Sequence, residues 1–292
     1  MLKFLKNWTL PLAMFAGAIG YFLLANVTIL EPAKPFVNWL IAVLTPFLIF
    51  AQLLLTFCKI EPKELLPKAW HVWLLSIQAV SSGIIALLLI FCPMEEAYRD
   101  IFEGAMVCLI CPTATAAAVI TGKLGGSAST LTTYTLLSNV LAAIAVPLVF
   151  PLVEPHADIT FVVAFLKILS KVFPLLLAPF FIALLFRYYI PSVHRLLSKY
   201  HGVAFYLWAV ALTIVTGQTV RSLVTAAADV SIEIMIALAG LATCCLQFYF
   251  GKRIGSAYHD RISAGQALGQ KNTVLAIWMA GTYLNPLSSV GP

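Results

Sequence analysis

The sequence predicts an all-α integral membrane protein, and three observations support this. Of the 292 residues, 61% are hydrophobic and 10% are charged, with a mean hydropathy of +0.96, whereas a soluble domain has roughly 25% charged residues. Apolar runs of about 20 residues, the length that a helix needs to cross a bilayer, recur along the chain. Two of these runs are interrupted near their middle by proline or by polar residues. The lipid bilayer is therefore the first predicted partner.

Nine apolar runs are long enough to span the membrane, and a single transporter-like domain, 1–292, accounts for all of them. They cover roughly residues 10–30, 36–57, 69–92, 101–122, 129–153, 164–189, 204–224, 232–250 and 263–284. Lys3 and Lys6 precede the first run, as in a secretory signal, but the run is too long for one and lacks a small-residue cleavage site. All six cysteines lie in or at the ends of spans, so we expect neither disulfides nor a metal site.

The basic residues predict an orientation rather than a nucleic-acid partner. The net charge is +6, but lysines and arginines are spread over short loops between spans. With the N-terminus in the cytoplasm, twelve of them fall in inner segments and three in outer loops, as the positive-inside rule requires. We therefore expect a protein integral to the cytoplasmic (inner) membrane with a cytoplasmic N-terminus; the oligomeric state is left open.

In the first three spans, one residue invites a functional interpretation. Gln78 lies near the middle of the otherwise apolar third span. An amide at that depth either hydrogen-bonds a neighbouring helix or belongs to a binding site, and the sequence leaves both open.

The fourth span is broken near its middle by Cys111-Pro112-Thr113. Pro112 has no N–H, so the carbonyl of Cys108 loses its helical partner and the backbone must kink or unwind. Within a bilayer, such backbone persists only where it is buried in protein or lines a wet cavity. We expect a binding site at the break, with Thr113 or Thr115 capping the second half of the span.

The fifth span carries many hydroxyl groups and one amide. Helical spacing places Thr132, Thr135 and Asn139 on one face. Packing between helices explains most of these polar residues, and only those that face the broken span are candidates for a site.

The second half repeats the plan of the first. An acidic loop at residues 154–160 separates a first repeat, 1–155 with spans one to five, from a second, 156–292 with spans six to nine. In the ninth span Gly265 and Gly269 form a face on which another backbone can pack closely. Residues 270–273, Gln-Lys-Asn-Thr, then place four polar side chains inside a membrane segment, and we expect Asn272 or Thr273 to cap the half-helix that follows.

An interrupted helix at corresponding positions of two halves is typical of an inverted-repeat transporter. The sequence therefore predicts an inverted 5+5 repeat in which two discontinuous helices, spans four and nine, cross each other. The tenth span is apparently absent from this chain.

Lys271 is the most informative single residue. A lysine at mid-membrane costs about 2.5–3.5 kcal/mol on insertion scales, so it usually has a partner. We expect all twelve acidic residues to lie in loops or at span ends, where they are poorly placed to pair with it. Lys271 either snorkels to an interface, attracts an anionic substrate as a fixed cation, or exchanges protons.

At these residues the chain resembles the bile acid:sodium symporter family, whose members move bile acids, pantoate, pyruvate-like and other organic anions. The segment CPTATAAAVITG is similar to the family's Cys-Pro-Gly-Gly-Thr-Ala-Ser-Asn-Val pattern, and GQKNTVLA to its Gly-Met-Gln-Asn-Ser-x-Leu-Ala pattern. A third segment, PKAWHVWLLSIQ, places Gln78 where the family has a glutamine in span three. The resemblance follows the span order along essentially the whole chain and implies ten spans in a core domain and a panel domain.

The resemblance also implies roles for particular residues. Thr115 and Asn272 match residues that face the substrate, and Gln78 and Thr135 match sodium ligands. Five positions depart from the family pattern, and none of their side chains offers an oxygen to a hard cation. They are Ala117 and Ala118 in place of Ser-Asn, Leu131 in place of a serine, Ala267 in place of a shared glutamate, and Lys271 in place of a ligating glutamine.

Together these observations predict a secondary transporter that moves a small organic anion, a carboxylate, by alternating access and without sodium, with Lys271 in place of the coupling ion. The predicted substrate-binding residues are Thr113, Thr115, Lys271, Asn272 and Thr273; the predicted coupling residues are Gln78, Thr135 and Lys271. We expect no cofactor and no enzyme activity, because the histidines lie in loops or at span ends without nucleophile or metal spacing.

Two other transporter classes stay open. In a sodium-coupled symporter of bile-acid-like or pantoate-like anions, Gln78, Thr135 and backbone carbonyls would hold one sodium ion. A cation/proton antiporter uses the same crossed half-helices but needs a carboxylate at mid-membrane, which we do not expect here. A membrane component without transport activity would leave both broken helices unexplained.

Overall fold

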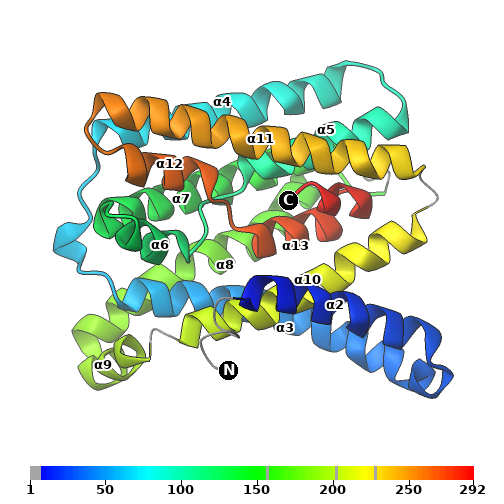
Figure 1. Ribbon diagram of the computed structural model, residues 1–292, viewed down its shortest axis with the longest axis horizontal. Coiled ribbons are helices and arrows are strands. Elements are labelled where there is room, and N and C mark those ends of the chain that lie inside the picture. Colours follow the sequence, from blue (N-terminus) through cyan, green and yellow to red (C-terminus); the bar gives the residue numbers. More distant parts are fainter. Residues whose placement is uncertain (1–7, 156–157, 201–202, 227–228) are drawn as a thin grey trace.

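The computed structural model describes residues 8–155, 158–200, 203–226 and 229–292, which are predominantly helical (Figure 1). Seven of the helical segments there are long and apolar enough to cross a membrane. The predicted all-α fold is therefore confirmed, and its membrane-spanning character is supported. These segments are α2 (Thr9–Asn26), η1 (Thr28–Ala33) continued by α3 (Lys34–Cys58), α4 (Ala69–Phe91), α7 (Ala128–Val153), α8 (Phe161–Tyr189), α10 (Val203–Thr225) and α11 (Val230–Ala257). Lys3, Lys6 and part of the acidic loop, residues 156–157, lie outside the described residues.

The predicted fourth and ninth spans are each divided into two shorter helices. The fourth consists of α5 (Glu96–Ile110) and α6 (Ala117–Lys123), and the ninth of α12 (Arg261–Gly269) and α13 (Thr273–Tyr283). Both interruptions lie where Pro112 and the polar run 270–273 predict them. The remaining described elements, α9 (Pro191–Lys199), η2 (Pro62–Glu64) and η3 (Pro286–Val290), are short.

The helices pack in two layers. One, which we call the core layer, contains α4, α5, α6, α7, α11, α12 and α13, with α11 packed on both α5 and α12. The other, the panel layer, contains α2, α3, α8 and α10. In Figure 1 α4, α11 and α5 lie at the top, α2, α3 and α10 at the bottom, and α6, α12 and α13 between them. α7 contacts α8, and α13 contacts α3 and α10, so the breaks lie near the boundary of the layers.

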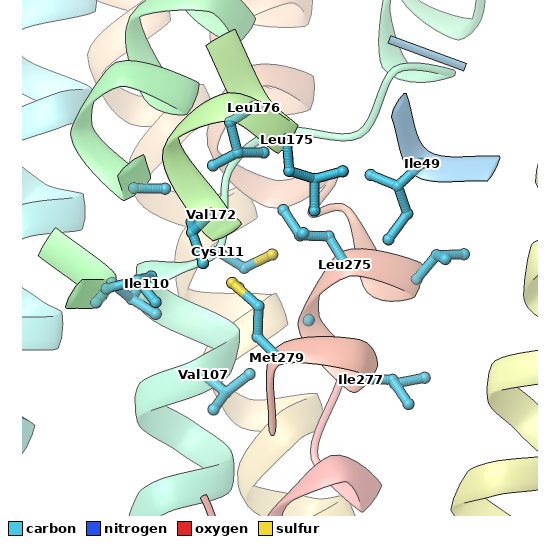
Figure 2. Packing of buried hydrophobic residues seen from close by; sticks show 14 of the residues in the cluster. Ile49, Val107, Ile110, Cys111, Val172, Leu175, Leu176, Leu275, Ile277 and Met279 are labelled. Carbon is cyan, nitrogen blue, oxygen red and sulfur yellow. The ribbon is translucent and has the colours of Figure 1, made fainter. Parts of the chain in front are cut away.

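Apolar side chains fill the boundary between the layers beside the breaks. Ile49 of α3 and Leu176 of α8 belong to the same buried cluster as Cys111 at the first break and Leu275 and Met279 of α13 (Figure 2). Lipid tails are as apolar as these side chains, so van der Waals packing rather than water exclusion holds membrane helices together. Close fit at this boundary therefore positions the broken helices.

The predicted glycine face of the ninth span is confirmed as a close contact, and α11 is its partner. Phe248 and Lys252 of α11 occupy the space where Cβ atoms of Gly269 and Gly265 would lie. On α11, a Cβ added at Gly251 would lie 2.6 Å from the carbonyl oxygen of Ala264. Small residues thus let the backbones of α11 and α12 approach each other.

Gly251→Ala is expected to lower the melting temperature of the purified protein in detergent. The new methyl group must push α12 away from α11, and overpacking of this kind costs about 1–3 kcal/mol. The control is Gly83→Ala in α4, where an added Cβ meets no atom within 4 Å and the melting temperature should hold or rise slightly. Equal melting temperatures for the two variants would contradict the close α11–α12 contact.

Candidate functional site

The two breaks lie against each other and share backbone hydrogen bonds. The N–H of Ala114 donates to the carbonyl of Gln270 at 2.9 Å, and the N–H of Asn272 donates to the carbonyl of Pro112 at 2.9 Å. Unwound backbone is costly in a bilayer unless its N–H and C=O groups are hydrogen-bonded. Each break therefore provides hydrogen-bond partners for some of the backbone groups of the other.

Side chains strengthen this junction. Thr113 and Lys271 lie opposite each other in an antiparallel bridge, and the buried hydroxyl of Thr113 donates to the carbonyl of Ala267 at 2.6 Å. The thiol of Cys111 donates to the carbonyl of Asn272 at 3.3 Å. The structure thus brings together three of the predicted substrate-binding residues, Thr113, Lys271 and Asn272.

The last carbonyl groups of α5 receive hydrogen bonds from side chains of other elements. A helix leaves its last four carbonyls without N–H partners, and Pro112 enforces this loss at residue 108. Side chains from three other elements replace the missing donors. Gln247 of α11 donates to the carbonyl of Cys108 at 3.4 Å, Lys271 to that of Leu109 at 3.3 Å, and Gln78 of α4 to those of Ile110 at 2.9 Å and Cys111 at 3.3 Å.

Gln78 uses both ends of its amide. The residue is 1% exposed. Its amide nitrogen donates to α5, and its oxygen accepts hydrogen bonds from the hydroxyls of Tyr134 at 3.2 Å and Ser138 at 3.0 Å. The buried Thr135, the other predicted coupling residue, donates instead to the carbonyl of Leu131 on its own helix at 3.1 Å. Gln78 therefore braces α4 and α7 to the break, and its oxygen already has two donors.

The predicted helix caps are right for one break and wrong for the other. The Asn272 side chain accepts a hydrogen bond from the N–H of Leu275 at 3.2 Å and caps α13, while the partly buried Thr273 is the first residue of that helix. α6 instead begins after Ala116 and has no side-chain cap. The prediction that Thr113 or Thr115 caps it is wrong, because the unwound stretch is longer than expected and both residues precede it.

Lys271 lies beside a cavity of about 90 Å³ within the core layer. An ammonium group has three donors, and one of them reaches Leu109. Among the described residues no carboxylate forms an ion pair with Lys271. The cavity is lined by Cys108, Gly240, Cys244, Gln247, Gly269, Lys271, Thr273, Ala276, Gly291 and Pro292. The site therefore combines a fixed positive charge with a partly open cavity.

Two polar residues of this region were not predicted from the sequence. Gln247 is a lone amide in an apolar span, the same signal that identified Gln78, and its buried oxygen has no hydrogen-bond partner in the described structure. Tyr134 precedes Ser138 by four residues and so shares its helix face. Both signals are present in the sequence, but only the packing shows which face meets the break.

The prediction that every acidic residue lies in a loop or at a span end is wrong for Glu103. This residue is in the middle of α5 and its side chain is fully buried. α5 begins at Glu96, several residues before the predicted start of the fourth span, which moves residue 103 into the interior of the helix.

No protein-family model matches the chain, and no curated protein is significantly similar to it. The resemblance carried by the two broken segments and Gln78 therefore stays an expectation, and the functional argument depends on the geometry described above.

Gln78→Leu is expected to lower the melting temperature markedly. The substitution removes the donor to two carbonyls and the acceptor of two hydroxyls, and each buried polar group left unpaired costs about 1–3 kcal/mol. Gln52→Leu is the matched control, because Gln52 is also a buried glutamine but its amide nitrogen has no hydrogen-bond partner in the described structure. Thermal unfolding in detergent compares the two, and a loss no larger for Gln78→Leu than for Gln52→Leu would contradict the bracing role.

Proposed function

We propose that this protein is a secondary transporter that moves a small organic anion, a carboxylate, by alternating access without sodium and without chemical change of the solute. The observation that carries the proposal is the Lys271 ammonium at the junction of the two breaks, which forms no ion pair with a described residue. We further propose that the protein resides in the cytoplasmic (inner) membrane with its N-terminus in the cytoplasm.

An unbalanced charge at this depth favours an anionic ligand. The ionisable groups that act on Lys271 are the thiols of Cys108 and Cys111, which are neutral when protonated. At an effective dielectric constant of 20, an opposite charge 4 Å away contributes about 4 kcal/mol of attraction. A carboxylate that enters the cavity supplies that charge and can accept N–H groups that Leu109 does not use.

The position of the ammonium also explains transport without sodium. Lys271 donates to the carbonyl of Leu109, at the C-terminal end of α5, where the helix dipole favours a cation. By the family resemblance, Lys271 stands where a sodium ligand is expected. The oxygen of Gln78, the other candidate ligand, already accepts from Tyr134 and Ser138. A protein-borne cation thus takes the place of a bound sodium ion.

The order of elements supports the predicted inverted repeat. In each half, a long helix with one buried glutamine precedes a broken pair: Gln78 in α4 before α5 and α6, and Gln247 in α11 before α12 and α13. We propose that 1–155 and 156–292 are the two repeats and that the broken helices cross at the Thr113–Lys271 bridge. Movement of the core layer along the apolar boundary with the panel layer then exposes the site to each side in turn.

The polar groups of the cavity suggest a substrate class. Lys271 offers N–H donors, whereas Gln247 offers an oxygen that has no donor in the described structure. A carboxylate that also carries a hydroxyl group satisfies both. The cavity volume of about 90 Å³ favours a small solute.

A cation/proton antiporter is less well supported, although Glu103 supplies a buried carboxyl. Glu103 precedes Cys111 by eight residues, about 12 Å along the helix, and a lysine rather than an acid lies at the break. Sodium-coupled symport remains the main alternative, and sodium dependence of uptake distinguishes it from the proposal.

Lys271→Met is expected to abolish carboxylate binding. In a thermal-shift assay, pantoate, pyruvate and cholate represent a hydroxylated, a small and a bulky carboxylate. At 100 times its dissociation constant a ligand stabilises the protein by about 2.7 kcal/mol, so at least pantoate should raise the melting temperature of the wild type and leave that of Lys271→Met unchanged.

The matched control for this assay is Lys123→Met, which removes an exposed lysine at the end of α6 and should respond to pantoate as the wild type does. If none of the three anions stabilises the wild type, or if Lys271→Met responds equally, the anion-binding role of Lys271 is refuted.

A further inference from the structure

Glu103 has an unusual environment for a carboxylate. It lies in the middle of α5 with a fully buried side chain, and neither carboxyl oxygen accepts a hydrogen bond from a described group. The nearest positive charge is Arg99 one turn earlier, whose Nε lies 3.3 Å from Glu103 Oε1. An ionised carboxylate in such a place is expensive unless donors surround it.

Arg99 is already committed to other partners. Its Nε donates to Glu154 Oε1 at 3.0 Å, its Nη1 donates to the carbonyl of Leu89 at 3.1 Å, and its Nη2 donates to the carbonyl of Val153. The single N–H of Nε is thus directed at Glu154, and Glu103 receives no hydrogen bond from it. Arg99 also ties α5 to the ends of α4 and α7.

The charges around Glu103 do not balance. Those that act on it are Arg99 and Asp100 of its own helix and Glu154 at the end of α7. Of the other elements that pack against α5, the helices α4, α13 and η3 contain no Asp, Glu, Lys or Arg, and the charged residues of α11 do not act on Glu103. Asp100 accepts a hydrogen bond from Asn285 at 2.7 Å. One guanidinium therefore faces three carboxyl groups.

A proton on Glu103 reduces this excess of negative charge. Arg99 Nε lies 3.3 Å from Glu103 Oε1 and 3.0 Å from Glu154 Oε1, so the two carboxyl groups meet at one guanidinium, but two carboxylates have no donor between them. When Glu103 is protonated, its O–H donates to the Glu154 carboxylate. Arg99 then faces two negative charges, and one of them, on Asp100, also accepts a hydrogen bond from Asn285. The side chain of Glu154 is 34% exposed and gives the proton a route to water.

We propose that Glu103 and Glu154 form a proton-binding site in which Glu103 holds the proton, Glu154 exchanges it with the aqueous phase, and Arg99 clamps the pair. The use of this site rests on the proposed function: it makes the proton the ion that is coupled to anion transport. Loss of the proton leaves both carboxylates competing for Arg99. That competition weakens the hold of Arg99 on α4 and α7 and frees α5, which leads directly to the break at Cys111.

Infrared difference spectroscopy of the purified protein in detergent tests the site without any transport measurement. At neutral pH the wild type should show the C=O stretch of a protonated carboxylic acid, and Glu103→Gln should lose that band. Glu96→Gln, which removes an exposed acid of the same helix, is the control and should keep it. Glu154→Gln frees Arg99 to neutralise Glu103, so it should lose the band as well.

Each result decides the proposal. Absence of the band from the wild type, or its persistence in Glu103→Gln, overturns proton binding at Glu103. Its persistence in Glu154→Gln, a substitution of a partly exposed residue that does not depend on how the core tolerates Glu103→Gln, overturns the shared site. The spectra do not depend on an anion, so failure of the transporter proposal and failure of the proton site remain distinguishable.

Discussion

The central constraint on this structure is that backbone unwound inside a bilayer must find hydrogen-bond partners within the protein. The hydrogen bonds between Ala114 and Gln270 and between Pro112 and Asn272 meet part of that need. Side chains of α4, α11 and the second break donate hydrogen bonds to the carbonyls at the end of α5. The core layer is therefore organised around one polar junction, and apolar packing against the panel layer surrounds it.

The same junction links structure to the proposed chemistry. Lys271 donates to a carbonyl of α5 and leaves a positive charge that no described acid neutralises, so the group that stabilises the break is also the group that we propose binds the anion. Glu103 lies on α5, the helix whose carbonyl Lys271 contacts, and Arg99 alone does not balance the negative charges around it. In the proposed function, α5 therefore carries the anion site at its end and the proton site in its middle, and a movement of this one helix affects both.

Much of this arrangement could be predicted from the sequence, because the signals are local. The length and hydropathy of the apolar runs predicted the spans. The missing N–H of Pro112 predicted the first break, and the polar run 270–273, with Asn272 as the cap, predicted the second. The rest depends on tertiary packing. Thr115 lies outside α6 because the unwound stretch is long. The hydroxyls of Tyr134 and Ser138 donate to Gln78, whereas that of Thr135 donates to its own helix. An earlier start of α5 buries Glu103. None of these outcomes has a local signal that decides it.

Uptake into proteoliposomes with sodium replaced by choline is the most direct test of the central claim that the Lys271 ammonium takes the place of a coupling metal ion. With radiolabelled pantoate as the probe, we expect equal initial rates in the two media at the same pH and membrane potential. Uptake that requires sodium, or the absence of any pantoate uptake by the wild type in either medium, would contradict the account.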